Sequence, residues 1–516
     1  MVTALLTRVE SPRPCPPTSG TSFMTKTVET EGALETRGIE QVPDHERTAK
    51  TRELFPTWVG ANISVLLLTM GASLVVAYHL GASLVVAYHL NIWQALVVAV
   101  AAPIVSYGLV GLIGTAGKRG GAPGMALSRA VFGQRGNLLP GSLIWVARWG
   151  WETINAVTGA YAMLTILDIL FGVEANSVLD MVTLLAFVVA TFAISGLGIN
   201  AVQKCNKYAT YFFGVFSVLV LGYLVANTDW QKVMDHSAGS TAAVITGIGM
   251  IAAGGVSWIP SAPDFTRYLP RTASSKAIVG TAVGGAGVVV LPMVLMGAVM
   301  AVATPDLASA SDPVSFLGEI LPTWIAVPYL FIALIGMLLI NSMSMYSAGF
   351  TAQTLGFKVP RHWAVSVNAV ISLVFGGVLM LVATSFMGSF IAFLSLLAVA
   401  FSAWVGVFGA DMFRRTEYDG AAMTDTTRTS AYWYRGGFSP AAVAAWAVGL
   451  VSGLMFTTSD WFTGPLAANN VIGEYGLGWV ATIVISGGLY LVLPKPAVER
   501  PAGTTEPAGE RETAGV

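Results

Sequence analysis

The sequence predicts an all-α integral membrane protein with twelve transmembrane helices, and three observations support this prediction. Hydrophobic residues make up 54% of the 516 residues and charged residues only 11%, whereas soluble domains carry about 25% charged residues. Long apolar stretches recur along the whole chain, and a helix that crosses a bilayer needs about 20 apolar residues. Lysine and arginine gather in every second connection between these stretches.

The apolar stretches are separated by polar or glycine-rich connections, and each is long enough for one span. They cover residues 57–80, 92–114, 140–168, 181–198, 208–226, 242–262, 277–303, 324–350, 363–383, 386–408, 440–457 and 477–494. The ends of the chain, 1–56 and 495–516, are polar and rich in proline, threonine and glutamate, so we expect disordered tails there.

The basic residues predict the orientation. If the N-terminus is cytoplasmic, the cytoplasmic connections hold nearly all the basic residues between spans, and the outer connections hold only Lys232. Cytoplasmic loops carry such an excess in membrane proteins. An even number of spans then places both termini in the cytoplasm of a multi-pass protein of the cell membrane, surrounded by the lipid bilayer.

A tandem repeat interrupts the first stretch. The segment GASLVVAYHL occurs at 71–80 and again at 81–90. One helix from Trp58 to Leu90 would be about 50 Å long, although the hydrocarbon core is only about 30 Å thick. We therefore expect one copy to lie outside the membrane or to bend the span. His79 and His89 are expected at the interface.

Several classes of function are excluded. The net charge of −1 gives no basic surface for nucleic acid. Cys15 and Cys205 are too few for a disulfide framework. Metal-ligand spacings, a GxSxG nucleophile elbow and a phosphate-binding loop are absent from the sequence. Charged rings and repeated pore motifs, which would indicate a channel, are absent too. We therefore expect neither an enzyme nor a bound cofactor.

The third stretch contains charged and amide side chains. Arg148 and Glu152 are four residues apart, so they share a helix face and can pair. Charged groups within a span indicate a functional site by default, and a structural ion pair between spans is the alternative. Trp151 and Asn155 lie on a neighbouring face, where an aromatic ring and an amide suit a flat, hydrogen-bonding heterocycle.

The sixth stretch is interrupted at 254–268 by glycine, proline and serine, with Ser257 and Trp258 at the break and Asp264 after it. Irregular backbone at membrane depth is tolerated only where protein or a cavity surrounds it, and broken spans mark substrate sites in transporters. The alternative is a helix that ends near Gly255, followed by a polar loop. In that case Asp264 pairs with Arg267 rather than carrying a proton.

The eighth stretch ends with a cluster of polar residues that includes Asn341, Ser344 and Ser347. Serines in a membrane helix can bind substrate, but they can also bond to their own backbone or aid helix packing.

The motifs together resemble the nucleobase:cation symporter-1 family, in its purine–cytosine permease branch. They occur in family order between about residues 38 and 410. The matching pieces are GIEQVPDHERT at 38–48, FGQRGNLLPG at 132–141, GWxxxN at 150–155, SWIPSAPDFTRYLP at 257–270 and NSMSMYSAGFTAQTLG at 341–356.

The resemblance implies a leucine-transporter-like fold. Spans 1–5 (57–226) and spans 6–10 (242–408) would form two inverted repeats, followed by two further spans (440–494). Substrate would bind midway, between the broken first and sixth spans and the faces of the third and eighth.

The resemblance also implies site residues. Relatives place the sixth-span aromatic about three residues before Trp258, where this chain has Gly255, and many have asparagine at the position of Ser344. The first-span break is expected near Gly71. The substrate-binding candidates are Trp151, Asn155, Ser257, Trp258, Asn341, Ser344 and Gly71.

The implied activity is import of cytosine or purine bases by cation symport through alternating access. Sodium-coupled relatives have hydroxyl side chains where this chain has Leu339 and Ile340, so the resemblance favours protons, with Glu152 and Asp264 as candidate carriers. The alternatives are a related heterocycle or ureide, such as allantoin, hydantoin or a thiamine-like compound, or coupling to sodium.

Overall fold

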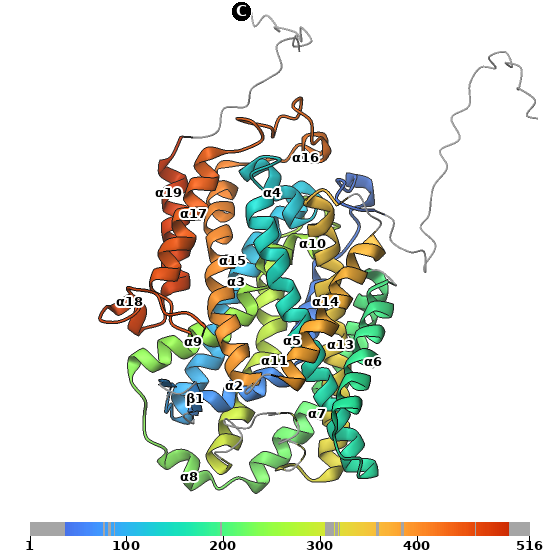
Figure 1. The fold of residues 1–516 in the computed structure, drawn as a ribbon, viewed down its shortest axis with the longest axis vertical. Coiled ribbons are helices and arrows are strands. Elements are labelled where there is room, and N and C mark those ends of the chain that lie inside the picture. The colour runs from blue at the N-terminus through green and yellow to red at the C-terminus, as the bar shows by residue number, and fades with distance from the viewer. Residues whose placement is uncertain are drawn as a thin grey trace, which may run out of the picture. The chain divides into compact units, whose positions relative to one another are not determined.

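The computed structural model describes residues 37–75, 78–80, 84–86, 88–196, 199–304, 314, 318, 320–357, 361–382, 386–459 and 461–494. Within these residues the chain is almost entirely helical (Figure 1). Residues 1–36 of the predicted N-terminal tail and all of the predicted C-terminal tail, residues 495–516, lie outside the described residues.

Each predicted apolar stretch coincides with one long helix or with two shorter ones. The long helices are α3 (Ile92–Gly120), α5 (Leu138–Phe171), α6 (Ser177–Gly196), α7 (Ile199–Asn227), α9 (Thr241–Val256), α11 (Ser275–Ala303), α13 (Thr323–Thr354), α14 (Arg361–Leu381), α15 (Phe386–Arg414), α17 (Pro440–Met455) and α19 (Gly478–Val492). The first stretch is divided into α1 (Leu54–Gly60) and α2 (Val65–Val75), and short helices α4 (Gly124–Phe132), α8 (Trp230–Asp235), α16 (Gly420–Thr424) and α18 (Val471–Glu474) lie in connections.

Among the described residues, eight helices are long and apolar enough to cross a membrane, and the bent pair α1–α2 makes a ninth. Three further apolar helices are shorter, at Ser366–Leu381, Pro440–Met455 and Gly478–Val492. The prediction of an all-helical, multi-pass membrane protein is confirmed. The number of twelve spans stays a prediction.

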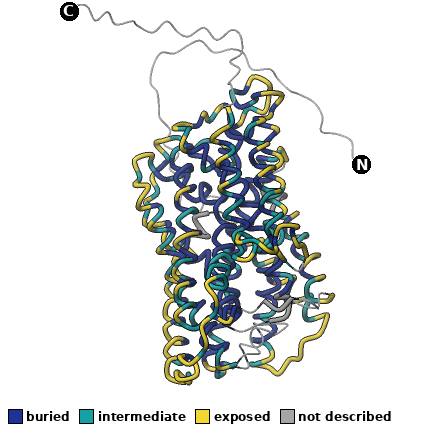
Figure 2. Tube along the Cα trace, turned by 90° about the vertical axis from the view of Figure 1, so that its left-hand side faces the viewer, coloured by how far each residue is buried: buried dark blue, intermediate teal, exposed yellow. Residues whose placement is uncertain are grey.

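Helices far apart in the sequence pack side by side. α11 lies against α3 and α2, α13 lies against α5, and α15 lies against α17 and α19 (Figure 1). Buried residues gather between the helices and exposed ones lie on the outside (Figure 2). Many exposed side chains of α6, α7 and α14 are apolar, such as Val189, Phe212 and Val374, as expected for helices that face lipid.

The first span breaks at residues 61–64, where α1 and α2 meet at an angle of 65°. The side chain of Asn62 donates to the carbonyl of Trp58 (2.8 Å) and so satisfies an acceptor at the end of α1. The expected break near Gly71 is wrong. Gly71 lies inside α2, and a Cβ there would come within 2.2 Å of the Val294 carbonyl oxygen on α11, so this glycine permits close helix packing.

The sixth span is irregular where the sequence predicts a break. α9 ends at Val256, and a 3₁₀ helix, η3 (Ile259–Ser261), and α10 (Ala262–Thr266) follow without a loop. Pro260 and Pro263 are the second residues of these two short helices, within the first turn, where the N–H groups have no partner inside the helix and a missing one costs no hydrogen bond. The alternative of a polar loop after Gly255 is wrong, because residues 257–266 are buried.

The tandem repeat is accommodated at the end of α2. This helix stops at Val75, and strands β1 (Tyr78–Leu80) and β2 (Leu84–Val86) then pair antiparallel. The chain returns at Leu90, whose N–H donates to the carbonyl of Leu74 (3.0 Å). The first half of the first copy therefore completes α2, and the end of the second copy returns to this helix at Leu90.

Deleting residues 81–90 is expected to leave the fold intact. Both copies are identical, so this deletion gives the same chain as removal of 71–80, and a shorter connection lowers the entropy cost of closing the loop. Thermal unfolding followed by size-exclusion chromatography should give a midpoint equal to or above that of the parent chain. Aggregation of the shortened protein would mean that the second copy is needed for folding.

Residues 37–53, which the sequence assigns to a disordered tail, are ordered, so that part of the prediction is wrong. The Val42 N–H donates to the carbonyl of Gly121 (2.8 Å) and the Ala49 N–H to that of Tyr268 (3.1 Å). Arg271 donates to the Asp44 carboxylate (3.1 Å) and holds the pKa of Asp44 below its ordinary value. This contact is present at neutral pH and weakens as the pH falls through that lowered pKa.

Arg47→Ala is expected to lower the free energy of unfolding by about 3 kcal/mol, because Arg47 makes two buried charged hydrogen bonds. Its buried guanidinium donates to the carbonyls of Val42 (2.9 Å) and Lys118 (3.1 Å). The exposed Arg52 gives the control variant Arg52→Ala, which should unfold like the parent protein. Equal unfolding midpoints for the two variants would show that the docking of residues 37–53 does not depend on Arg47.

Candidate functional site

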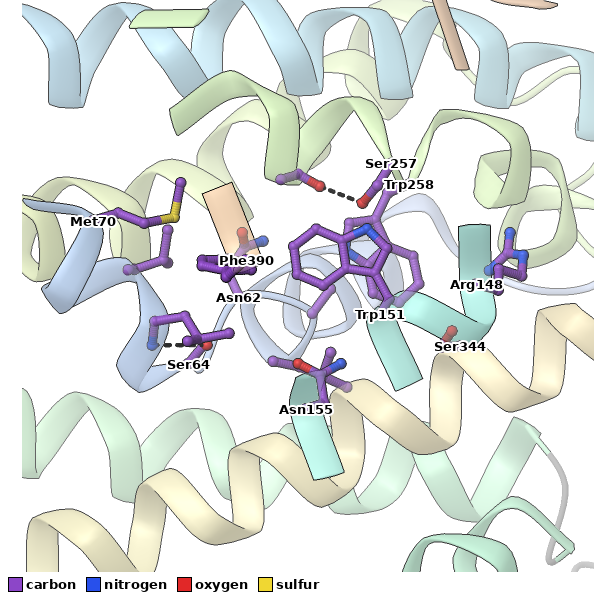
Figure 3. A pocket seen from close by; sticks show the side chains of 15 residues that line it. Asn62, Ser64, Met70, Arg148, Trp151, Asn155, Ser257, Trp258, Ser344 and Phe390 are labelled. Atoms are coloured by element: carbon purple, nitrogen blue, oxygen red, sulfur yellow. Dashed lines mark hydrogen bonds between the residues drawn. The ribbon is translucent and has the colours of Figure 1, made fainter. Parts of the chain in front are cut away.

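A cavity of about 60 Å³ lies where the break between α1 and α2 faces α5, α9, α13 and α15 (Figure 3). We call it the central cavity. It is lined by Ala61, Asn62, Ser64, Leu66, Leu67, Met70, Arg148, Trp151, Asn155, Gly254, Ser257, Trp258, Ile340, Ser344 and Phe390.

The structure brings together five of the predicted substrate-binding residues, from three distant stretches of the chain. They line the central cavity and are Trp151, Asn155, Ser257, Trp258 and Ser344.

Gly71 and Asn341, which were also predicted, are not among the lining residues. Gly71 packs against α11, as described above. Asn341 is fully buried, and neither amide atom has a hydrogen-bond partner among the described residues. The prediction followed its place in the polar motif of the eighth span, but α13 contributes Ile340 and Ser344 to the cavity lining instead.

The bend of the first span supplies residues that the sequence analysis missed. Asn62 and Ser64 lie in the break and reach the cavity, and Phe390 comes from α15. The signal was present in the segment GANIS at 60–64, where a glycine and two polar residues interrupt an apolar stretch. The family resemblance placed the break near Gly71 instead.

The two indole rings of the cavity are held by other aromatic rings. Trp151 meets Phe390 edge to face, with ring centroids 5.8 Å apart. Trp258 meets Trp58 (6.5 Å) and Phe265 (6.3 Å) in the same way. Such contacts fix the orientation of each ring, so the cavity has rigid aromatic walls.

Three hydrogen-bond donors of residues that line the cavity have no partner among the described residues. They are the indole N–H of Trp151, the side-chain amide nitrogen of Asn155 and the Nε–H of Arg148. A buried donor without an acceptor costs about 1–3 kcal/mol. A ligand that brings acceptors to these donors would recover that free energy.

Arg148 and Glu152 do not form the predicted ion pair. Arg148 donates to the hydroxyl of Ser261 on η3. Glu152 accepts hydrogen bonds from Ser344 (3.1 Å) and from Asn368 (3.2 Å). The spacing of four residues allowed the pair, but side chains from three other helices compete for both groups.

Asp264 is buried and bridges two other helices, so its interpretation as a loop carboxylate is wrong. One oxygen accepts from the N–H of Gly124, the first residue of α4 (2.8 Å), and the other accepts from the hydroxyl of Ser347. The neighbouring Arg267 donates to the carbonyl of Gly38 (2.8 Å).

Helix α13 connects the two carboxylates. Ser344 and Ser347, three residues apart, donate to Glu152 and Asp264 respectively. The charge of Arg148 acts on both carboxylates. Because Arg148 and Ser344 line the central cavity, a chain of polar groups leads from the cavity to α4.

A bundle of apolar helices that bend around a cavity, with charged groups beside it, is the architecture of a secondary transporter. The chain belongs to the family of permeases for cytosine/purines, uracil, thiamine and allantoin, whose model matches residues 41–478. The protein is therefore a transporter and not an enzyme.

Three individual proteins are similar to the chain. A Bacillus subtilis protein named as a purine-cytosine permease, YxlA, is 24% identical over 92% of this chain and 98% of its own length. Mhp1, a nucleobase-cation-symport-1 family transporter solved in a closed conformation with bromovinylhydantoin bound, has a TM-score of 0.69 at 20% identity over 89% of this chain and 95% of its own. A Na⁺-coupled sialic acid symporter has a TM-score of 0.55 at 12% identity, with coverage of 89% and 93%. The two structures establish the fold.

Proposed function

We propose that the protein imports nucleobases, cytosine or purines, by proton symport through alternating access. The observation that carries this proposal is the central cavity, where Trp151 and Trp258 provide aromatic walls and Asn155 an amide. Both termini are expected in the cytoplasm of a cell that carries the transporter in its plasma or inner membrane.

The cavity selects for a small, flat and polar ligand. Pockets for drug-sized ligands measure about 300–1,000 Å³, whereas the central cavity measures about 60 Å³. A nucleobase can stack on an indole ring, and its carbonyl oxygens and ring nitrogens can accept from Trp151 and Asn155.

A related heterocycle is the second candidate. The same walls suit hydantoin, allantoin or a thiamine-like compound, and the similar Mhp1 holds bromovinylhydantoin. The name of the B. subtilis relative, a purine-cytosine permease, favours nucleobases.

Proton coupling is supported by the residues opposite the break. The hydroxyl of Ser64 contacts the sulfur of Met337 (3.8 Å), and the side chains of the neighbouring Leu339 and Ile340 of α13 offer no oxygen. Hard cations prefer oxygen ligands, so this surface is poorly suited to sodium. Sodium coupling is the alternative.

Of the two buried carboxylates, Glu152 is the better candidate for the proton carrier. Its hydrogen bond from Ser344 places it one residue away from the cavity lining. Asp264 is bound to Gly124 of α4 and to Ser347, and neither of these residues lines the cavity.

The substrate is tested by uptake of radiolabelled cytosine in cells without their own permease, with adenine, allantoin and hydantoin as unlabelled competitors. We expect cytosine uptake that adenine or excess cytosine reduces and that allantoin does not. No cytosine uptake, together with uptake of labelled allantoin or hydantoin, would contradict the nucleobase assignment and support the second candidate.

A further inference from the structure

A second cavity, of about 350 Å³, lies between α9, α15 and the chain that joins α17 to α19. It is larger than the central cavity and falls within the size range of sites for drug-sized ligands. Its wall contains three aromatic side chains, those of Tyr88, Phe456 and Trp479. Several aliphatic and hydroxyl side chains complete it.

Three hydroxyl groups of this wall can act only as acceptors toward a ligand. Thr246, Ser395 and Thr457 each donate their hydroxyl proton to the backbone carbonyl four residues earlier, at 2.9 Å. Their oxygen lone pairs remain available. Glu474 adds an exposed carboxylate to the lining.

The lining residues include no lysine, arginine or histidine. The indole N–H of Trp479 is one donor in the wall, and it has no partner among the described residues although Trp479 is only 8% exposed. The second cavity therefore combines aromatic surface, several acceptors, one negative charge and an unpaired donor.

We propose that the second cavity is a binding site for an aromatic amine in its ammonium form that also carries one hydrogen-bond acceptor. The ammonium group donates to hydroxyl oxygens and is attracted by the Glu474 carboxylate, and aromatic rings stabilise a nearby cation. The acceptor of the ligand receives the N–H of Trp479.

The site is placed to influence the central cavity. On α9, Ala253 lines the second cavity and the next residue, Gly254, lines the central cavity. On α15, Ile391 lines the second cavity and Phe390 lines the central cavity. A ligand between these helices opposes their relative movement, so we expect it to reduce transport without competing with substrate. This effect on transport rests on the proposed function, whereas binding does not.

Tyramine, which has an ammonium group and a phenol oxygen, is the probe. We would measure its binding to the purified full chain by isothermal titration calorimetry, with 3-(4-hydroxyphenyl)propionate as the ligand of opposite charge. Tyramine should bind and the anion should not. Glu474→Gln should weaken tyramine binding about 3- to 5-fold, as expected for an exposed charge pair. Ser395→Leu, which fills the cavity, should weaken it at least 10-fold.

Trp479→Phe keeps an aromatic ring but removes the donor. It should weaken tyramine binding about 5-fold, the value of one hydrogen bond, and leave binding of 2-phenylethylamine, which lacks the phenol oxygen, unchanged. Val448→Leu on the exposed surface of α17 is the control for the cavity-filling variant.

Tyramine binding by a central-cavity variant and competition by cytosine separate this proposal from the proposed function. Asn155→Ala, in the central cavity, should bind tyramine like the parent protein even if it transports nothing. The proposal is overturned if tyramine does not bind, if Ser395→Leu binds it as well as Val448→Leu does, or if cytosine displaces it competitively. Failure of cytosine uptake alone would leave tyramine binding as predicted and would contradict only the nucleobase assignment.

Discussion

Replacing Trp151 or Asn155 with alanine is expected to reduce uptake severalfold or more while leaving the protein folded in the membrane. Each variant removes one donor from the central cavity, and Trp151→Ala also removes a stacking surface. Stacking of a base on an aromatic side chain contributes about 1–3 kcal/mol, and a buried hydrogen bond to substrate about 1 kcal/mol. We therefore expect at least a 10-fold fall in the initial rate for Trp151→Ala, about a 5-fold fall for Asn155→Ala, and no detectable uptake for the pair.

The initial rate of uptake must be divided by the amount of folded protein. That amount is measured by size-exclusion chromatography of protein solubilised from the same membranes. Trp324→Ala and Asn227→Ala are matched controls, because both residues are exposed and lie outside the lining of the central cavity. Near-normal uptake by Trp151→Ala and Asn155→Ala would remove the third span from the substrate site.

Glu152→Gln is expected to separate substrate movement from the proton gradient. Glutamine can still accept from Ser344 and Asn368 through its carbonyl oxygen, so the local hydrogen bonds (3.1 and 3.2 Å) persist without the titratable group. Accumulation of substrate against its gradient should fall at least 10-fold, whereas exchange of labelled for unlabelled substrate should stay within about 2-fold of the parent rate.

Asp264→Asn is the matched variant for the second carboxylate. It should retain protonophore-sensitive accumulation if Glu152 carries the proton. The opposite pattern, with accumulation lost in Asp264→Asn and kept in Glu152→Gln, would contradict the assignment and move the carrier to the contact between α10, α4 and Ser347.

Much of the fold was predictable from the sequence because helices in lipid must be long, apolar and continuous. The irregular sixth span was predictable too, since Pro260 and Pro263 cannot continue a regular helix. The break of the first span was harder to place. The polar residues Asn62 and Ser64 gave only a weak local signal, and the family resemblance placed the break near Gly71 instead.

The central cavity was predictable in part. Five of its residues stood out as polar or aromatic side chains in apolar stretches: Trp151, Asn155, Ser257, Trp258 and Ser344. The family resemblance implied that they line one substrate site. The hydrogen-bond partners of the buried charged side chains were not predictable. A spacing of four residues brings Arg148 and Glu152 to one helix face, but their partners Ser261, Ser344 and Asn368 come from helices more than 100 residues away.

The central claim is that the central cavity carries a nucleobase together with a proton. The most direct measurement is uptake of radiolabelled cytosine into proteoliposomes that contain only the purified protein, under an imposed proton gradient (inside alkaline) or an imposed inward sodium gradient. We predict accumulation with the proton gradient, its collapse on addition of a protonophore, and its absence from liposomes that carry Trp151→Ala with Asn155→Ala. Accumulation that requires sodium and ignores the proton gradient would contradict the account.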